Sequence, residues 1–271
     1  PMVGLLMAFQ DYKVAKGLFG SPWVGLDKFK ELFAGAQFGY AFRNTVYMAL
    51  LNLTLGFIIP VILGLLISQV RNKRTSRVVQ TTTYMPYFVA PVVVCTLAKE
   101  FLKEGGAITM FLTMFGLPNQ NWLAVNSPVF WFINCFLGIW QGAGYGAIVY
   151  IAAINGIDQN LYEAACIDGA SRWQRLWNIT IPSVVPLVVM MFTMQIGLVF
   201  MTGFDKVLLL YMPTTYEFSD CLSTYTYRMA FSSGSDFSLS TASGLLQSVI
   251  GTLLLIFGNK LSAKATKMSL F

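Results

Sequence analysis

One polar segment, residues 161–173, offers charged and small side chains at a spacing suited to recognising another molecule. It reads Leu-Tyr-Glu-Ala-Ala-Cys-Ile-Asp-Gly-Ala-Ser-Arg-Trp, and the runs 105–157 and 176–204 on either side of it contain no charged residue. Glu163 could pair with an opposite charge on a partner, and the small side chains of Ala164 and Ala165 would let a partner helix or groove approach closely. Segments that cross lipid must satisfy their backbone polar groups internally, so this charged loop is predicted to lie outside the membrane.

The same segment carries signals that start and end short helices. Asp158 can cap a helix that runs to Ile167, and Gly169 stands where a helix end commonly needs a left-handed residue. Ser171 followed by Gln174 forms a capping-box pattern for a second helix. The pattern predicts two short helices at an angle along the membrane face, although a solvated loop with ordinary caps remains the alternative. The first helix would place four residues on one face and the second would carry an amphipathic stripe before Pro182: Leu161, Ala164, Ala165 and Asp168, then Trp173, Leu176, Trp177 and Thr180.

The chain lacks the residues of the common catalytic sites. It contains no histidine, which excludes His-based acid–base chemistry, Ser-His-Asp triads and His-rich zinc sites. No Gly-x4-Gly-Lys-Ser/Thr phosphate loop is present, so we expect no ATP hydrolysis, catalytic residue, metal or cofactor in the chain itself. Cys95, Cys135, Cys166 and Cys221 are expected in separate compartments and therefore predict no disulfide framework.

Composition places this segment in a membrane protein. Hydrophobic residues make up 56% of the chain and charged residues 11%, against about 25% charged residues in soluble domains. The uncharged stretches are residues 1–10, 46–67, 78–98, 128–155, 183–204 and 237–259. All but the first reach the roughly 20 residues that a helix needs to cross a bilayer. The first is about half a span, and we expect a first helix that is cut.

The sequence therefore predicts an all-α polytopic membrane protein with a single transmembrane domain over residues 1–271. The expected spans are about 1–10 (partial), 44–70, 78–101, 128–155, 183–204 and 237–260. The expected loops are 156–182 on one side and 11–40, 102–127 and 205–236 on the other. Residues 26–33 have the spacing of an amphipathic surface helix, and the apolar stretch 108–117 favours a partly inserted hairpin.

Lysine and arginine are distributed unevenly between the two sides. With alternating spans, one side receives nine basic residues against three acidic ones, and the other receives nine of each. The positive-inside rule makes the first side, which includes 156–182, cytoplasmic. Nucleic-acid binding is the other common meaning of a basic chain, but these residues are scattered over loops that flank spans, so no nucleic acid is expected. The basic residues on the cytoplasmic side are Arg71, Lys73, Arg74, Arg77, Arg172, Arg175, Lys260, Lys264 and Lys267.

Prolines and glycines indicate a bundle with an internal path. Pro60, Pro86 and Pro91 lie within expected spans, where each implies a bend and carbonyl groups that need other partners. Gly138, Gly142 and Gly146 recur at every fourth residue, which predicts a tightly packed helix pair on that face.

The polar segment resembles a known motif. Glu163-Ala164-Ala165 and Asp168-Gly169-Ala170, with Ile179, Ile181 and Pro182 following, resemble the EAA loop of ATP-binding-cassette importer permeases. That family's pattern ends in Ile-x-Leu-Pro, and here Ile181 replaces the usual Leu with little change in volume. The Asp-Gly-Ala form and the six-helix layout are similar to the maltose-permease-like, carbohydrate-uptake branch. Residues 203–213 and 223–228 resemble the subgroup that imports complex or plant-derived oligosaccharides.

The resemblance implies a set of partners and a mechanism. The chain would be a multi-pass permease of the bacterial cytoplasmic membrane that moves oligosaccharides by alternating access. It would pair with a second homologous permease, identical or related, and with two ATPase subunits that bind ATP and Mg. An extracellular solute-binding protein would deliver the sugar. The implied ATPase-coupling residues are Leu161, Glu163, Ala164, Ala165, Asp168, Gly169 and Arg172.

The route of the sugar is defined less sharply by the sequence. Carbohydrate sites favour aromatic faces beside amide and hydroxyl groups, and polar groups within spans often mark a cavity. For each candidate, a buried hydrogen bond between helices is the competing explanation. The candidates are Tyr84, Tyr87, Asn134, Trp140, Gln141, Tyr145 and Gln195.

A secondary transporter or channel without an ATPase partner is the main alternative function. Such a protein is expected to carry charged relay residues within its spans or repeated discontinuous helices. The uncharged stretches here and the polar loop at 161–173 favour the importer.

Overall fold

The computed structural model describes residues 2–201, 203–232, 234 and 236–266, so Pro1 and Lys267 lie outside the described residues. Within these ranges the elements are helical, apart from one isolated β-bridge between Gln10 and Trp23. The all-α prediction is confirmed. The chain divides into two compact units, and unit 1 comprises Pro1–Leu51, Ala90–Cys135 and Leu198–Leu253. Unit 2 comprises Asn52–Val89, Phe136–Gly197 and Leu254–Phe271.

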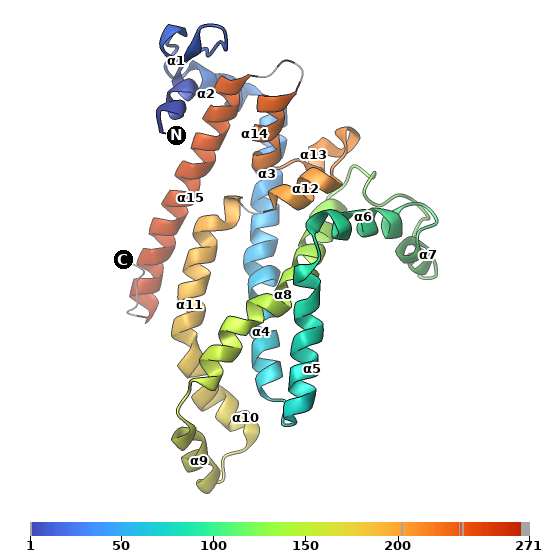
Figure 1. Ribbon diagram of the computed structural model, residues 1–271, viewed down its shortest axis with the longest axis vertical. Helices are drawn as coiled ribbons and strands as arrows, with labels where there is room; N and C mark the ends of the chain where they lie inside the picture. Colours follow the sequence, from blue (N-terminus) through green and yellow to red (C-terminus); the bar gives the residue numbers. More distant parts are fainter. Residues whose placement is uncertain (1, 202, 233, 235, 267–271) are drawn as a thin grey trace. The chain divides into compact units, whose positions relative to one another are not determined.

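Unit 1 contains many short helices packed on a few longer ones. The segment 205–236, which the sequence predicts as a loop, is largely helical here, and α13 and α14 pack on α3. The Asn44 side chain of α3 explains part of this order, because its Nδ2 donates to the carbonyls of Glu217 (3.0 Å) and Asp220 (2.9 Å). The elements, all visible in Figure 1, are η1 (Met2–Phe9), α1 (Gly17–Gly20), α2 (Asp27–Ala34), α3 (Ala36–Leu51), α6 (Pro91–Leu102), α7 (Ala107–Thr113), the first part of α8 (Val129–Asn155), η5 (Val199–Met201), α12 (Phe204–Leu210), η6 (Pro213–Thr215), α13 (Tyr216–Ser219), α14 (Leu222–Phe231) and the first part of α15 (Phe237–Thr266).

Two smaller expectations also fall in unit 1. The amphipathic spacing at 26–33 corresponds to α2, as predicted. The apolar stretch 108–117 forms the single helix α7, whose chain turns at Gly116 with φ of +82°, rather than a hairpin.

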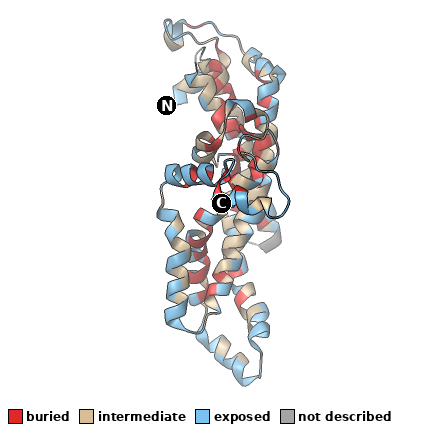
Figure 2. Ribbon diagram, turned by 90° about the vertical axis from the view of Figure 1, so that its right-hand side faces the viewer, coloured by how far each residue is buried: buried red, intermediate tan, exposed pale blue. Residues whose placement is uncertain are grey.

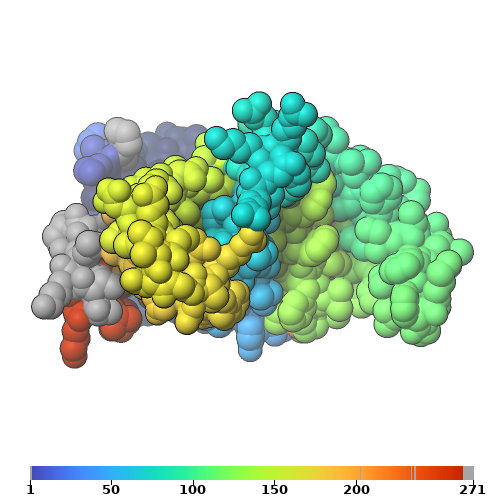
Figure 3. All heavy atoms as spheres, turned by 90° about the horizontal axis from the view of Figure 1, so that it is seen from below, coloured from blue at the N-terminus to red at the C-terminus, as the bar shows by residue number. Residues whose placement is uncertain are grey.

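Unit 2 contains the polar segment. Its elements are η2 (Asn52–Gly56), α4 (Phe57–Ser68), α5 (Lys73–Tyr84), η3 (Met85–Phe88), the second part of α8, α9 (Gln159–Ile167), α10 (Arg172–Arg175), η4 (Leu176–Thr180), α11 (Ile181–Leu198) and the end of α15. The residues of α9 and α10 are mostly exposed, as the pale blue ribbon in Figure 2 shows, and their yellow spheres lie on the side that faces the viewer in Figure 3.

Long apolar helices account for most of the expected spans. Ala36–Ser68, Val129–Asn155, Arg172–Leu210 and Phe237–Lys264 are long and apolar enough to cross a membrane. Only 11% to 39% of the residues in their most apolar windows are buried inside the protein, so most of these side chains face outward. Outward apolar surface on this scale suits helices whose solvent is hydrocarbon.

Proline and its neighbours interrupt the expected third span. Helix η3 ends at Phe88, Val89 and Ala90 are extended, and α6 starts at Pro91. The two prolines predicted a bend in the stretch 78–101, and the structure confirms that this stretch is not one continuous helix. Pro60 lies in the first turn of α4, and α4 directly follows the π-helical turn η2. The wider π-helical turn relieves the clash that a proline ring makes with the preceding turn.

The glycines of α8 permit close packing, but mainly on a different face from the one predicted. At Gly146 an added Cβ would lie 3.3 Å from the side chain of Pro60, whereas at Gly142 it would meet nothing within 4 Å. The tightest approach is at Gly144, where an added Cβ would overlap with the carbonyl of Thr83. On α4, a Cβ added at Gly64 would lie 2.9 Å from the Cβ of Tyr150, so this glycine also permits a close helix contact. The prediction of close helix contact is thus right for Gly146 and missed Gly144.

Candidate docking site

Helix α9 is closed at both ends by local hydrogen bonds. Asp158 Oδ1 accepts from the backbone N–H of Asn160 at 3.0 Å and caps the N-terminus. At the C-terminus Gly169 has φ of +77° and its N–H donates to the Cys166 carbonyl at 3.1 Å. The next N–H, of Ala170, donates to the Ala165 carbonyl at 2.8 Å, which completes a Schellman motif. Both predicted ends of this helix are confirmed, and the helix is a short rigid rod.

The second helix starts as predicted but does not stop. Ser171 and Gln174 form the capping box, with Ser171 N–H to Gln174 Oε1 at 2.7 Å and Gln174 N–H to Ser171 Oγ at 3.3 Å. From there α10 passes through the π-helical turn η4 directly into α11. The expectation of a separate short helix before Pro182 is therefore wrong. The wider π turn bonds Ile181 N–H to the Leu176 carbonyl, and this extra residue lets the helix continue into the proline.

Two side-chain contacts fix α9 against the start of this long helix. The hydroxyls of Tyr162 and Thr180 lie 2.9 Å apart and share a hydrogen bond, and Thr180 is buried. Arg175 Nη1 donates to the thiol sulfur of Cys166. Tyr162 and Cys166 are four residues apart and so occupy one face of α9, its inner face, which contacts Thr180 and Arg175. A displacement of α9 would therefore act on α10 and, through the continuous helix, on α11.

The opposite face of α9 is open for contact. Glu163 and Ala164 are exposed, and Ile167 has 87% of its surface exposed, although it is a large apolar residue. Within the described chain no lysine or arginine lies within 4.0 Å of the Glu163 carboxylate. An exposed isoleucine beside an unpaired carboxylate suits a partner surface that offers an apolar pocket and a basic group.

Most of the predicted coupling residues are exposed. Leu161, Glu163, Ala164, Asp168, Gly169 and Arg172 are exposed, whereas Ala165 is half-buried and turned toward the protein. Sequence reasoning did not single out Ile167, an exposed apolar residue of α9. Its signal was present, because it follows Glu163 and Ala164 at helical spacing and is apolar inside a polar segment.

Three of the substrate-path candidates come together in unit 2, where η3 ends. The rings of Tyr87 and Tyr145 are stacked, with centroids 3.9 Å apart and planes 5° apart. Gln141 Nε2 donates to the Val89 carbonyl at 2.7 Å, in the extended stretch before Pro91. Gln141 thus satisfies a carbonyl that the helix break leaves without an intrahelical partner, which is a structural role. The half-exposed tyrosine pair offers an aromatic face.

The remaining candidates are more dispersed. Trp140 is 47% exposed, and Tyr84 and Gln195 are half-buried. Asn134 belongs to unit 1, where its Nδ2 lies 3.4 Å from Met48 Sδ and its Oδ1 is buried with no hydrogen-bond partner among the described residues. Asn134 therefore belongs to a different unit from the other six candidates.

A buried ion pair orders the segment of unit 1 after α12. Arg228 Nη2 lies 2.6 Å from Asp220 Oδ2, Thr224 Oγ1 donates to Asp220 Oδ1 at 2.7 Å, and the guanidinium lies over the Tyr216 ring at 3.9 Å. Burial raises the pKa of Asp220 to about 6, against the opposing effect of Arg228 and the hydrogen bonds. Arg228 lies in the stretch 223–228 that carries the subgroup resemblance.

Comparison with known proteins agrees with this architecture. Residues 56–267 match the family described as binding-protein-dependent transport system inner membrane component. The polygalacturonan/rhamnogalacturonan transport system permease protein YteP of Bacillus subtilis is 37% identical over 265 residues, which cover 97% of this chain and 82% of that protein. Protein LplB of the same organism is 35% identical over 273 residues, covering 100% and 85%.

A solved structure is also similar. A chain of a bacterial ABC transporter involved in the import of the acidic polysaccharide alginate matches with a TM-score of 0.89 and 37% identity. The match covers 98% of this chain and 89% of that one. In a second structure, the alginate transporter is in complex with a periplasmic protein that holds an alginate pentasaccharide, and the TM-score is again 0.89.

Proposed function

We propose a mechanism for this chain as a subunit of an importer. The chain belongs to the family of binding-protein-dependent transport system inner membrane components, and it is a membrane-embedded subunit of an ABC importer. Its cargo is an oligosaccharide, delivered by an extracellular solute-binding protein. A second, homologous permease completes the path, and two separate ATPase subunits bind ATP and Mg and supply the energy. The relatives named for polygalacturonan, rhamnogalacturonan and alginate support an oligosaccharide cargo.

The observation that carries the proposal is the geometry of α9. A lever must keep its shape under load, and α9 has a capped N-terminus and a complete Schellman motif at its C-terminus. It must also present a surface to the motor, and Glu163, Ala164 and Ile167 are exposed on one side. Finally, it must be connected to the path, and Tyr162 and Arg175 join it to the helix that continues as α11.

The resulting mechanism is mechanical. The outer face of α9 seats in a groove of one ATPase subunit, with Glu163 paired to a basic group and Ile167 in an apolar pocket. ATP-driven closure of the ATPases moves α9, and the contacts of Tyr162 and Arg175 pass the movement to the continuous helix 172–198. Reorientation of that helix switches the cavity between its inward-facing and outward-facing states. The basic side of the chain, including 156–182, faces the cytoplasm on this proposal.

The experiment replaces the charge on the outer face of α9. Glu163→Lys in the complete transporter should abolish ATP-driven uptake into proteoliposomes, while the binding protein still binds sugar. The matched control is Glu104→Lys, the same change at an exposed acidic residue of unit 1, which should transport normally. Normal uptake by Glu163→Lys, or equal loss by both variants, would contradict the proposed docking face. Oligosaccharides prepared from alginate, polygalacturonan and a neutral glycan, compared by their stimulation of ATP hydrolysis, identify the cargo class.

A further inference from the structure

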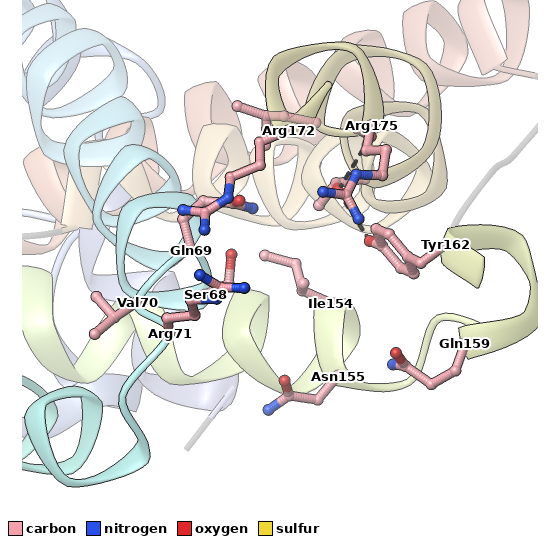
Figure 4. Close-up of a pocket in the computed structure, with 12 residues that line it drawn as sticks. Ser68, Gln69, Val70, Arg71, Ile154, Asn155, Gln159, Tyr162, Arg172 and Arg175 are labelled. Atoms are coloured by element: carbon pink, nitrogen blue, oxygen red, sulfur yellow. Dashed lines mark hydrogen bonds between the residues drawn. The ribbon is translucent and has the colours of Figure 1, made fainter. Parts of the chain in front are cut away.

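A polar cavity of about 480 Å³ lies in unit 2, next to the inner face of α9. Its walls come from the end of α4, the chain that links α4 to α5, the end of α8, α9 and the segment 172–180. Figure 4 shows the side chains of Arg71 and Arg172 directed toward Ser68 and Gln69, and that of Arg175 beside Tyr162. The cavity thus brings together three guanidinium groups from segments about a hundred residues apart.

The positive charge of the cavity is not neutralised within the described part of the chain. Arg71, Arg172 and Arg175 line it, and no aspartate or glutamate does. The acidic residues nearest in sequence are Asp158, Glu163 and Asp168 on α9 and its ends, and none of the described ion pairs joins them to these arginines. Three like charges around one cavity repel one another unless an anion lies between them.

The hydrogen bonding of Arg175 is an independent observation that points to an anionic ligand. Its Nη1 donates to the Cys166 sulfur, a weak acceptor, and its Nε is buried with no hydrogen-bond partner among the described residues. An unsatisfied buried guanidinium N–H is costly, and such a group in a native protein calls for a ligand or an ion. Arginine presents its N–H groups as a planar fork that matches the oxygen atoms of a phosphate.

The surroundings favour a membrane source for that phosphate. Trp173 and Trp177 lie on the same segment, are 67% and 54% exposed, and contact each other edge to face with centroids 6.0 Å apart. Exposed tryptophans at the end of a long apolar helix are typical of the level of the lipid headgroups. Basic pockets between helices on the cytoplasmic side of membrane proteins are suited to anionic headgroups.

We propose that this cavity binds the phosphate of an anionic phospholipid headgroup from the cytoplasmic leaflet through Arg71, Arg172 and Arg175. The inference rests on the orientation in the proposed function above. A bound headgroup would bridge the α4–α5 link and the segment 172–175, and so hold the base of the α9 lever at the membrane surface. A free phosphate or phosphate ester offers the same chemistry, and the experiment distinguishes the two sources.

The test uses the purified complete transporter in detergent and the double variant Arg71→Gln/Arg175→Gln. Native mass spectrometry measures retention of added phosphatidylglycerol against phosphatidylcholine. Loss of two arginines near a headgroup should weaken phosphatidylglycerol binding by about thirtyfold. The control, Lys73→Gln/Arg74→Gln, removes two positive charges from exposed residues of the same region that do not line the cavity, and it should bind like the parent. Arg71→Gln alone, at an exposed position, should cost about fivefold and covers the case in which the double variant misfolds.

Each outcome decides the proposal. Selective phosphatidylglycerol binding that the cavity variants lose and the control keeps supports a lipid. Calorimetry measures the binding of inorganic phosphate. If phosphate binds with the same dependence on the two arginines and displaces the lipid, the result supports the site, with a soluble phosphate as its ligand. Unchanged binding in the double variant, or equal loss in the control, overturns the proposal. These measurements need neither ATP nor sugar, and Glu163→Lys should bind lipid normally, so a failure of the docking proposal would be seen separately.

Discussion

The backbone conformation of Gly169 gives the sharpest test of α9 as a rigid lever. Its φ of +77° lies in the left-handed region, and a Cβ added there would meet nothing within 4 Å. The cost of Gly169→Ala is therefore conformational rather than steric, about 1–2 kcal/mol. That cost shifts the equilibrium between the closed C-terminus of α9 and a frayed one by roughly five- to thirtyfold.

Other substitutions at this position grade the effect. Gly169→Asn should be tolerated best, since asparagine visits the left-handed region more readily than other side chains. Gly169→Pro should be the worst, because proline fixes φ near −65° and removes the N–H that donates to the Cys166 carbonyl, a loss of about 3 kcal/mol or more. The expected order of coupling is Gly, then Asn, then Ala, then Pro.

The assay compares uptake into proteoliposomes with the ATP hydrolysis that the loaded binding protein stimulates. The matched control is Gly116→Ala, which has φ of +82° and an equally open surrounding but lies in unit 1, after α7. It should carry the same backbone strain and leave coupling intact. Wild-type coupling in Gly169→Pro, or an asparagine variant as poor as the proline variant, would refute the rigid-lever reasoning.

Three further substitutions test individual contacts, two in unit 2 and one in unit 1. Gly144→Ala should lower the melting temperature of the purified transporter, by a loss of about 1–3 kcal/mol, because the added methyl overlaps with the Thr83 carbonyl; an unchanged melting temperature would contradict that contact. Tyr162→Phe should reduce stimulated ATP hydrolysis and remove about 1 kcal/mol of stability, and a double-mutant cycle with Thr180→Val should show that both act through one hydrogen bond. Burial raises the pKa of Asp220 from 3.8 to about 6, so the folded state binds this proton more tightly than the unfolded chain. The contribution of Asp220 to the stability of the folded protein should therefore be fully present below its unfolded pKa of 3.8 and be lost, by about 3 kcal/mol, as the pH rises through 6. Thermal melts of Asp220→Asn should lack this loss, and an identical pH profile in the variant would contradict it.

Local signals in the sequence predicted the helix ends of the polar segment. Both ends of α9 and the capping box at Ser171 depend on residues within five positions of each other, so their geometry can be read from the chain. The continuation past Pro182 could not be read in this way. A proline normally predicts a helix start or break, and only the π turn η4 makes it compatible with a continuous helix.

Features set by distant partners were the ones that sequence reasoning missed. The spacing of Gly138, Gly142 and Gly146 identifies one face of α8, but which face meets a neighbour depends on where Thr83 passes, and that places Gly144 at the contact. The helical order of 205–236 depends in the same way on Asn44 of α3, far away in the chain. No local pattern carries that information, because the residues involved are separated by more than fifty positions.

Cross-linking from the outer face of α9 tests the central claim most directly. A cysteine introduced by Ala164→Cys, in a Cys166→Ser background, is exposed beside Glu163 and can react with a short bifunctional reagent in intact membranes. We predict a cross-link to an ATPase subunit whose yield changes on addition of ATP. A cross-link to the extracellular binding protein, or labelling of this cysteine by a membrane-impermeant thiol reagent added from outside the cell, would contradict the account.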